Sequence, residues 1–285
     1  MSKRKGGDVL SNSRHFDQEI IVLCVRWYRR YKLSLRDLVE MMAERGLSLA
    51  HTPVMHWVMR FTPEFVKRWN RFAIPSGRSW RVDETHMRIR GRWVYLYRAV
   101  DRDGHTEDFL LGVKRDVAAA KAFFREATRH QGQSPETITL DGYAASHRAV
   151  REMKVDNLLP EDTKVQSSKY LNNLIEQGHR NIKSRTNAML GLKWFANAAV
   201  TISGIELMHR IRKGQFDLTK LGLKHAAMPA VWNAVLSSSY NILHVGTFST
   251  LLPVCTRTRK PNMRTQIAPL RIAVDRKRVD RSVPP

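Results

Sequence analysis

The sequence predicts an α/β protein: a small all-α N-terminal domain, followed by a larger domain in which a mixed β-sheet carries helices on both faces. Two patterns support this prediction. Apolar residues recur at three- and four-residue steps over residues 16–61, which is typical of one face of a helix. After residue 79, segments rich in β-branched and aromatic residues alternate with helical segments. A length of 285 residues allows one large or two smaller domains.

The net charge points to a polyanionic partner. Lys and Arg number 49 against 26 Asp and Glu, which gives a formal charge of +23. Nucleic acid is the simplest partner for such an excess, and a merely solubilised or ribosomal-type basic protein is the alternative. Two cysteines exclude a disulfide framework and a cysteine-rich zinc site. No secretory signal pattern and no apolar run near ~20 residues is present, so we expect a cytoplasmic, nucleoid-associated protein without a membrane partner.

Residues 1–15 predict a flexible basic N-terminus, and residues 16–66 predict a helix-turn-helix domain. The first helix has an apolar face, with Arg29 outside it. In the second helix, Ser34 is the expected N-cap, and Asp37 can close a capping box.

A third helix is expected to begin at Thr52 and Pro53, since a capping hydroxyl followed by proline suits a helix start. As the recognition helix, it would present His56 and Arg60 to the major groove. A plain three-helix bundle is the alternative. A connector pattern starts at Thr62, and residues 67–79 are interpreted as the linker to the next domain.

Residues 80–215 predict an RNase H-like catalytic domain. The expected order is three strands in an antiparallel meander, a helix, a strand, a helix, a strand and a helix. In chain order these elements cover residues 80–89, 92–101, 105–113, 116–130, 136–141, 143–153, 163–168 and 171–188. This order is the layout of an RNase H-like mixed sheet.

Two acidic residues stand where acids are unusual. Asp83 lies inside the first strand, and Asp141 ends the buried strand at residues 136–141. The first and fourth strands are neighbours in this topology, so the two carboxylates should face each other. Mg²⁺ or Mn²⁺ would relieve their repulsion, and a third carboxylate would complete a site for two ions.

Glu176 is the candidate third ligand, because its helix should return over the sheet. Arg180 and Lys183 share its helix face and could hold a DNA backbone beside the site. The alternative is a Glu176–Arg180 ion pair on a solvated helix. Glu84 follows Asp83, and only one of these two is expected to face the site. His179 lies near the site without an assigned role.

These residues resemble a known family. The stretches "WRVDETHMRI", "TITLDGYAASHRAV" and "NNLIEQGHRNIKSR" are similar to those of bacterial insertion-sequence DDE transposases, most closely the insertion-sequence-six family. Thirty-four residues separate Asp141 from Glu176, the short interval of that family, and a basic residue follows seven positions after the glutamate. The resemblance implies that Asp83, Asp141 and Glu176 form the metal-binding triad and that Lys183 contacts DNA at the element end.

The resemblance further implies binding of terminal inverted repeats in double-stranded DNA, metal-dependent strand cleavage, strand transfer into target DNA and action as a homo-oligomer. Family members end sooner, so residues 216–285 are interpreted as an atypical basic tail, either a DNA-binding arm or, as we favour, a frameshift product. A non-catalytic DNA-binding regulator or a decayed transposase is the alternative function. An RNase H-like nuclease without strand transfer would share the same site.

Overall fold

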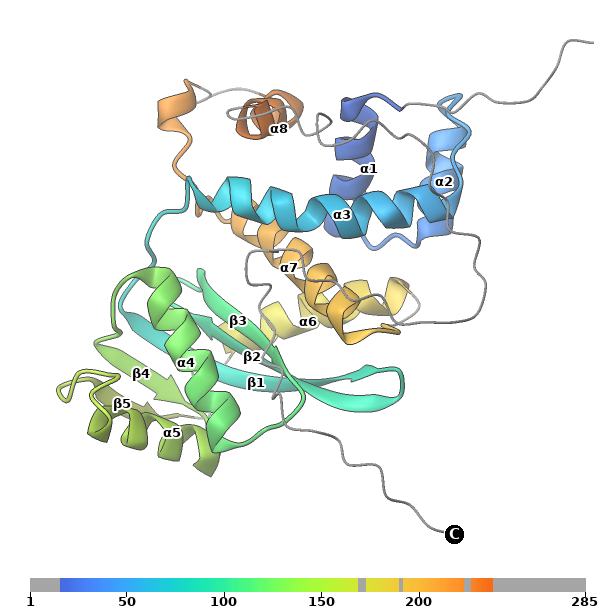
Figure 1. Cartoon of the computed structure of the whole chain (residues 1–285). Helices are drawn as coiled ribbons and strands as arrows, with labels where there is room; N and C mark the ends of the chain where they lie inside the picture. Colours follow the sequence, from blue (N-terminus) through green and yellow to red (C-terminus); the bar gives the residue numbers. More distant parts are fainter. Residues whose placement is uncertain (1–15, 169–172, 190–191, 223–226, 238–285) are drawn as a thin grey trace, which may run out of the picture.

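The computed structural model describes residues 16–168, 173–189, 192–222 and 227–237. Helices form one end of the molecule and a sheet covered by helices forms the other (Figure 1). The expected N-terminal segment 1–15, the predicted helix start at Leu171 and most of the predicted tail lie outside the described residues. Within the described parts of the chain, no helix is long and apolar enough to cross a membrane.

Three helices make up the N-terminal domain, as predicted: α1 (Gln18–Arg30), α2 (Leu35–Ala43) and α3 (His51–Asn70). Ser34 caps α2 through its side chain, and the Asp37 carboxylate accepts from the Ser34 backbone N–H at 2.8 Å. The predicted capping box is therefore confirmed. Apolar side chains of all three helices meet in one buried cluster, which also includes residues of two later helices.

The expected limits of the third helix are wrong at both ends. It starts at His51 with Ala50 at the N-cap position and no side-chain cap, so Thr52 lies inside the first turn. Its C-terminal half continues through Pro63 to Asn70, where a connector was expected. The cause is tertiary: Phe65 and Trp69 are each 1% exposed and bury the added turns against later helices.

Arg29, which lies off the apolar face of α1, is nevertheless fully buried. Helix α1 packs against α2 and α3 on one side and against α7 (Phe195–Arg212) on another, so two faces are covered. The Arg29 Nε donates to the Thr62 hydroxyl at 3.3 Å. Burial lowers the pKa of Arg29 to about 10. The apolar pattern of α1 predicts one buried face, but it does not reveal that a second face of this helix packs against another helix.

The sheet has the predicted strands, in the order β3-β2-β1-β4-β5. They are β1 (Ser79–Ile89), β2 (Arg92–Val100), β3 (Thr106–Gly112), β4 (Thr137–Leu140) and β5 (Lys164–Ser167). The first three form the antiparallel meander, and β4 pairs in parallel with both β1 and β5. This mixed topology confirms the RNase H-like fold, and the central position of β1 beside β4 is as expected.

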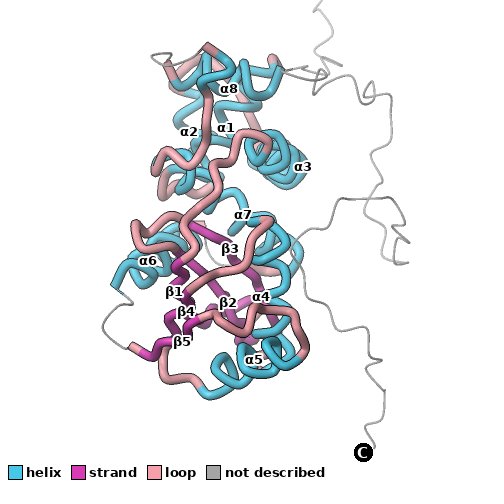
Figure 2. Tube along the Cα trace, turned by 90° about the vertical axis from the view of Figure 1, so that its left-hand side faces the viewer, coloured by secondary structure: helices cyan, strands magenta, loops and turns pink. Residues whose placement is uncertain are grey.

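Helices cover both faces of the sheet (Figure 2). On one face, α4 (Val117–Gln131) and α5 (Ala144–Val155) enclose a core with Trp80, Val82 and Phe123. On the other, α6 (Asn173–Ala188) and α7 enclose a core with Leu96 and Ile202. Helix α7, which was not anticipated, contributes to this core and to that of the helical domain, so it joins the two.

Helix α6 runs unbroken through Gly178, a position where the packing against β2 leaves room only for glycine. A Cβ on Gly178 would lie 1.7 Å from Nη1 of Arg98 on β2. The absence of a side chain therefore lets the helix pass directly over this arginine. This close approach places the rest of α6 above the centre of the sheet.

Residues 228–237, inside the predicted tail, form helix α8 (Met228–Ser237). Its Trp232 is 1% exposed and contacts Phe65 and Trp69 of α3, with ring centroids 5.2 and 5.1 Å apart. This part of the segment is therefore packed into the helical domain. The domain boundaries drawn from the sequence stay predictions.

Candidate active site

The two strand acids lie side by side at the centre of the sheet. Val82 and Leu140 are the last residues paired between β1 and β4, so Asp83 and Asp141 are the next residues on each strand. Their side chains are 15% and 25% exposed, which leaves the carboxylates accessible at the end of β4. The side chains of Asp83, Glu84 and Asp141 each offer an oxygen, and these oxygens lie within 4.8 Å of one another.

Glu84 corrects the expectation that only one of two successive strand residues can reach the site. Its carboxylate points toward α5, where it accepts from the Ser146 hydroxyl, and Nη2 of Arg115 lies 3.0 Å from it. The pairing of β1 with β4 ends at Val82 and Leu140. After that pair the sheet no longer keeps the side chains of Glu84 and Asp141 on opposite faces. Burial raises the pKa of Glu84, while its hydrogen bonds with Ser146 and Arg115 act in the opposite direction.

Arg115 joins Glu84 to Asp141. Its Nη2 is also 3.6 Å from Oδ2 of Asp141, and its guanidinium lies 3.5 Å from the centre of the Tyr143 ring. Tyr143 in turn donates its hydroxyl to the Arg115 carbonyl at 2.6 Å and its backbone N–H to Asp141 Oδ1 at 3.0 Å. Asp141 is thus held from two sides by residues that the sequence did not single out.

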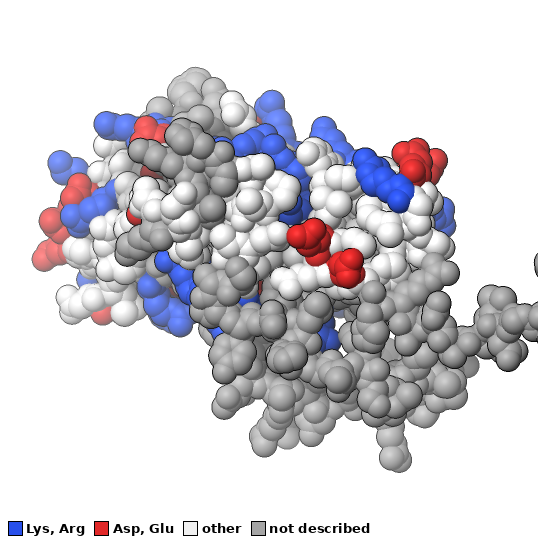
Figure 3. Space-filling view, turned by 90° about the horizontal axis from the view of Figure 1, so that it is seen from above, with Lys and Arg blue, Asp and Glu red and all other residues white. Residues whose placement is uncertain are grey.

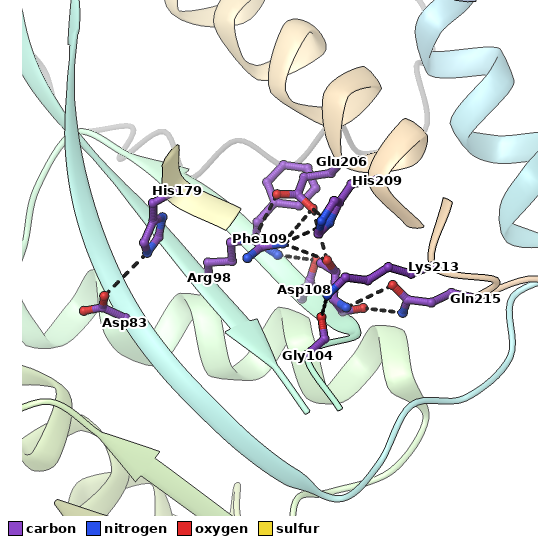
Figure 4. A network of polar contacts seen from close by, with 11 residues as sticks. Asp83, Arg98, Gly104, Asp108, Phe109, His179, Glu206, His209, Lys213 and Gln215 are labelled. Atoms are coloured by element: carbon purple, nitrogen blue, oxygen red, sulfur yellow. Dashed lines mark hydrogen bonds and ion pairs between the residues drawn. The ribbon is translucent and has the colours of Figure 1, made fainter. Parts of the chain in front are cut away.

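Helix α6 contacts the site through His179. The Nε2 of His179 lies 3.6 Å from Oδ2 of Asp83, and the ring is almost fully buried (Figure 4). Burial lowers the pKa of His179, which favours the neutral ring. A histidine one turn after Glu176 therefore faces the first strand acid.

Glu176 itself points elsewhere. Its side chain is 52% exposed and forms an ion pair with Arg180 at 3.1 Å, as the alternative interpretation expected. Among the residues that the structure describes, it belongs to no group of three potential ligands within 4.8 Å. The structure thus brings two of the three predicted ligands together and leaves the third on the same helix as His179.

A buried ionic network supports the sheet next to this site (Figure 4). Arg98 lies opposite Asp83 in the register of β1 and β2. Its Nε donates to Oε1 of Glu206 on α7 at 2.9 Å, and its Nη2 donates to the Thr106 hydroxyl at 2.9 Å. Burial raises the pKa of Glu206, but the charges of Arg98 and His209 outweigh this and bring it below its usual value.

A second acidic group, on the turn between β2 and β3, serves the fold. Asp101 accepts backbone hydrogen bonds from Asp103, His105 and Gly77 at 2.9, 2.8 and 3.2 Å. These bonds occupy both carboxylate oxygens and shape the turn. Asp108 on β3 is 1% exposed and lies 2.8 Å from His130 on α4.

The predicted recognition residues lie on the surface of the helical domain. His56 and Arg60, one helical turn apart on α3, are both exposed, while Val54 and Val58 face the core. Figure 3 looks at this end of the molecule from above, and Lys and Arg side chains are distributed around it. His56 and Arg60 therefore lie on the exposed stripe of α3.

The fold and the site together define an RNase H-like protein with paired acids on adjacent central strands. A family model described as a DDE domain matches residues 77–215. The transposase for insertion sequence-like element IS431mec of Staphylococcus aureus strain Mu50 is 36% identical over 200 residues, which are 70% of this chain and 87% of that protein. The transposase of IS257 in transposon Tn4003, also from Staphylococcus aureus, is 35% identical over the same shares. The chain belongs to this family of DDE transposases, the insertion-sequence-six family.

Among solved structures, the integrase catalytic core domain of HTLV-2 in complex with magnesium is 17% identical. The match covers 47% of this chain and 85% of that one, with a TM-score of 0.37.

Proposed function

We propose that this transposase binds the terminal inverted repeats of its element, cleaves DNA strands there and transfers the freed 3′ ends into target DNA. One observation carries the proposal: Asp83 and Asp141 meet on neighbouring strands of the domain that matches the DDE model. Acids are disfavoured in strands, and two close carboxylates repel each other, so the fold alone does not account for them.

The donor set fits a divalent cation of the Mg²⁺ type. Asp83 and Asp141 supply carboxylate oxygens, the ligands that such hard ions prefer, and both remain partly exposed. We propose that these two residues and Glu176 hold two ions. Bound there, the ions would activate the attacking oxygen and stabilise the leaving oxygen of the phosphodiester.

The proposed roles of the other residues follow from their positions. To bind an ion, the Glu176 side chain would separate from Arg180 and turn toward Asp83. Breaking an exposed ion pair of this kind costs at most ~0.5 kcal/mol. Released from Glu176, Arg180 would join Lys183 in contacting the DNA backbone beside the site. His56 and Arg60 would read the inverted repeats in the major groove. A homo-oligomer would hold the two element ends together.

The test is cleavage of a linear duplex that carries the terminal inverted repeats flanking the gene for this chain. With Mg²⁺ or Mn²⁺, we expect nicking at the repeat end, and loss of nicking in Asp83→Asn and Asp141→Asn, with DNA binding retained. Asp103→Asn, on an exposed turn, is the matched control and should cleave normally. Cleavage that persists in Asp83→Asn would refute the assignment.

Glu176→Gln tests the third ligand separately. If Glu176 binds an ion, this variant should lose both nicking and strand transfer. If Glu176 only pairs with Arg180, nicking should continue at the wild-type rate. Intact binding to the repeats without any cleavage by the wild-type chain would instead favour a DNA-binding regulator.

A further inference from the structure

The hairpin between β1 and β2 extends past the rest of the sheet (Figure 1). Strand β4 pairs with β1 only as far as Val82, and β3 pairs with β2 only from Tyr95 onward. Beyond these points, within the described residues, no further strand pairs with this ribbon apart from a single bridge at Ile89. Met87, Ile89 and Val94 of the ribbon are buried in the core beneath α6 and α7, whereas its other face and its turn carry exposed residues that the core does not explain.

The ribbon and an adjoining segment carry five exposed residues that we call the hairpin patch: Arg88, Arg90, Arg92, Trp93 and Trp194. Trp93 is 49% exposed and Trp194 59%. Large exposed aromatic side chains are characteristic of binding surfaces. No acidic residue occurs in residues 85–100 or 192–205, so the charge of the patch is not balanced by its neighbours in sequence.

The hairpin patch is held in a fixed shape. Arg90 and Gly91 both have positive φ, 50° and 76°, as a two-residue hairpin turn requires. The Arg90 N–H donates to the Leu192 carbonyl at 2.9 Å, and Ile89 pairs with Leu192 in a single parallel bridge. These contacts place Trp194 beside the turn.

Each tryptophan stacks with an arginine. The guanidinium of Arg88 lies 4.5 Å from the ring centre of Trp93, and that of Arg90 lies 5.0 Å from the ring centre of Trp194. In the described parts of the chain, neither arginine forms an ion pair with an acidic side chain. The patch therefore offers flat aromatic surfaces next to uncompensated cations, the combination that binds single-stranded nucleic acid.

The position of the patch relative to the acids supports this use. Arg88 follows Glu84 by four residues on β1, so both point to the same face and lie about 13 Å apart along the strand. A strand that passes the site along β1 would reach the patch.

We propose that the hairpin patch binds single-stranded DNA next to the cut, with unpaired bases stacked on Trp93 and Trp194 and phosphates held by the arginines. This inference rests on the proposed function, since it assigns part of the DNA path to this surface. A second copy of the chain is the less suitable occupant. A symmetric contact would place the same arginines against one another without acids to pair them.

The experiment compares two labelled duplexes, one blunt and one with an eight-nucleotide single-stranded overhang, by fluorescence anisotropy in EDTA. Because unpaired bases stack on aromatic side chains, Trp93→Ala with Trp194→Ala should weaken overhang binding about ten-fold or more. Blunt-duplex binding should change less than two-fold. Trp93→Phe keeps an aromatic face and should retain most of the overhang affinity. Arg151→Ala, an exposed cation on α5, is the control.

Equal overhang affinity in the double tryptophan variant and the wild-type chain would overturn the proposal. So would a change in oligomeric state, measured by sedimentation velocity, caused by that variant without a loss of overhang binding. The assay contains no divalent ion, and Asp83→Asn should bind the overhang normally. Failure of cleavage and failure of this inference are therefore separate outcomes.

Discussion

Replacing Arg98 by methionine should destabilise the protein by about 3–5 kcal/mol, because it leaves a buried carboxylate without its partner. Arg98 and Glu206 are 1% and 2% exposed, and the arginine donates to both Glu206 oxygens, at 2.9 and 3.2 Å. Methionine fills part of the volume but offers no donor. The loss is therefore electrostatic rather than a matter of packing.

The double variant Arg98→Met with Glu206→Leu should recover most of this loss. Replacing both members of a buried ion pair by apolar residues is often neutral or stabilising. Urea unfolding at pH 7, followed by circular dichroism, measures each free energy of unfolding. Arg148→Met is the matched control: its ion pair with Glu152 is surface-exposed, and its loss should change the free energy of unfolding far less than the loss of Arg98 does.

The pH dependence gives a second test of the same reasoning. In the native protein the pKa of Glu206 is lowered, so its stabilisation is present above the unfolded pKa and is lost as pH falls through the folded value. In Arg98→Met, burial dominates and raises this pKa. The variant should then lose stability as pH rises. A cost below 1 kcal/mol, or an unchanged pH profile, would refute the argument.

Three further predictions concern single side chains. Gly178→Ala should destabilise the fold although alanine favours helices, because its Cβ would lie 1.7 Å from Nη1 of Arg98; a raised melting temperature would contradict this. Burial, followed by repulsion from Asp101, raises the pKa of Glu107 to about 8. The stability that Glu107 contributes is complete below the unfolded pKa near 4.3 and is lost as pH rises through 8. Glu107→Gln should therefore melt at a higher temperature than the wild-type chain at pH 9. Equal melting temperatures at that pH would contradict the prediction. Trp232→Ala should cost about 3–5 kcal/mol in urea unfolding, because its ring is 1% exposed; a cost under 1 kcal/mol would mean that α8 is not part of the core.

The sequence allowed prediction where the signal is local or periodic. The capping box at Ser34 and Asp37 depends on two residues three positions apart, and the strands follow from runs of β-branched and aromatic residues. Asp83 and Asp141 could be placed together because strand order fixes which strands are neighbours. The metal-binding and DNA-binding roles of these and the other predicted site residues stay predictions.

Prediction failed where a second packing surface decides the outcome. Arg29 and the C-terminal half of α3 are buried by helices far along the chain. Glu84 joins the acidic group because β4 ends one residue before Asp141, a limit that the pattern of residues 136–141 does not reveal. Side chains alternate between the two faces of β1, as expected. Where β4 has ended, however, the long Glu84 side chain can still reach Asp141.

The sequence by itself determined the element order, the strong positive charge and the two strand acids, since each depends on residue type and short-range spacing. Only the tertiary structure decided which charges meet in the interior. Arg98 and Glu206 are 108 residues apart, and Arg115 reaches Glu84 across 31. The pairing of buried charges depends on distances and on exclusion of water, and neither exists until the sheet and its helices have packed.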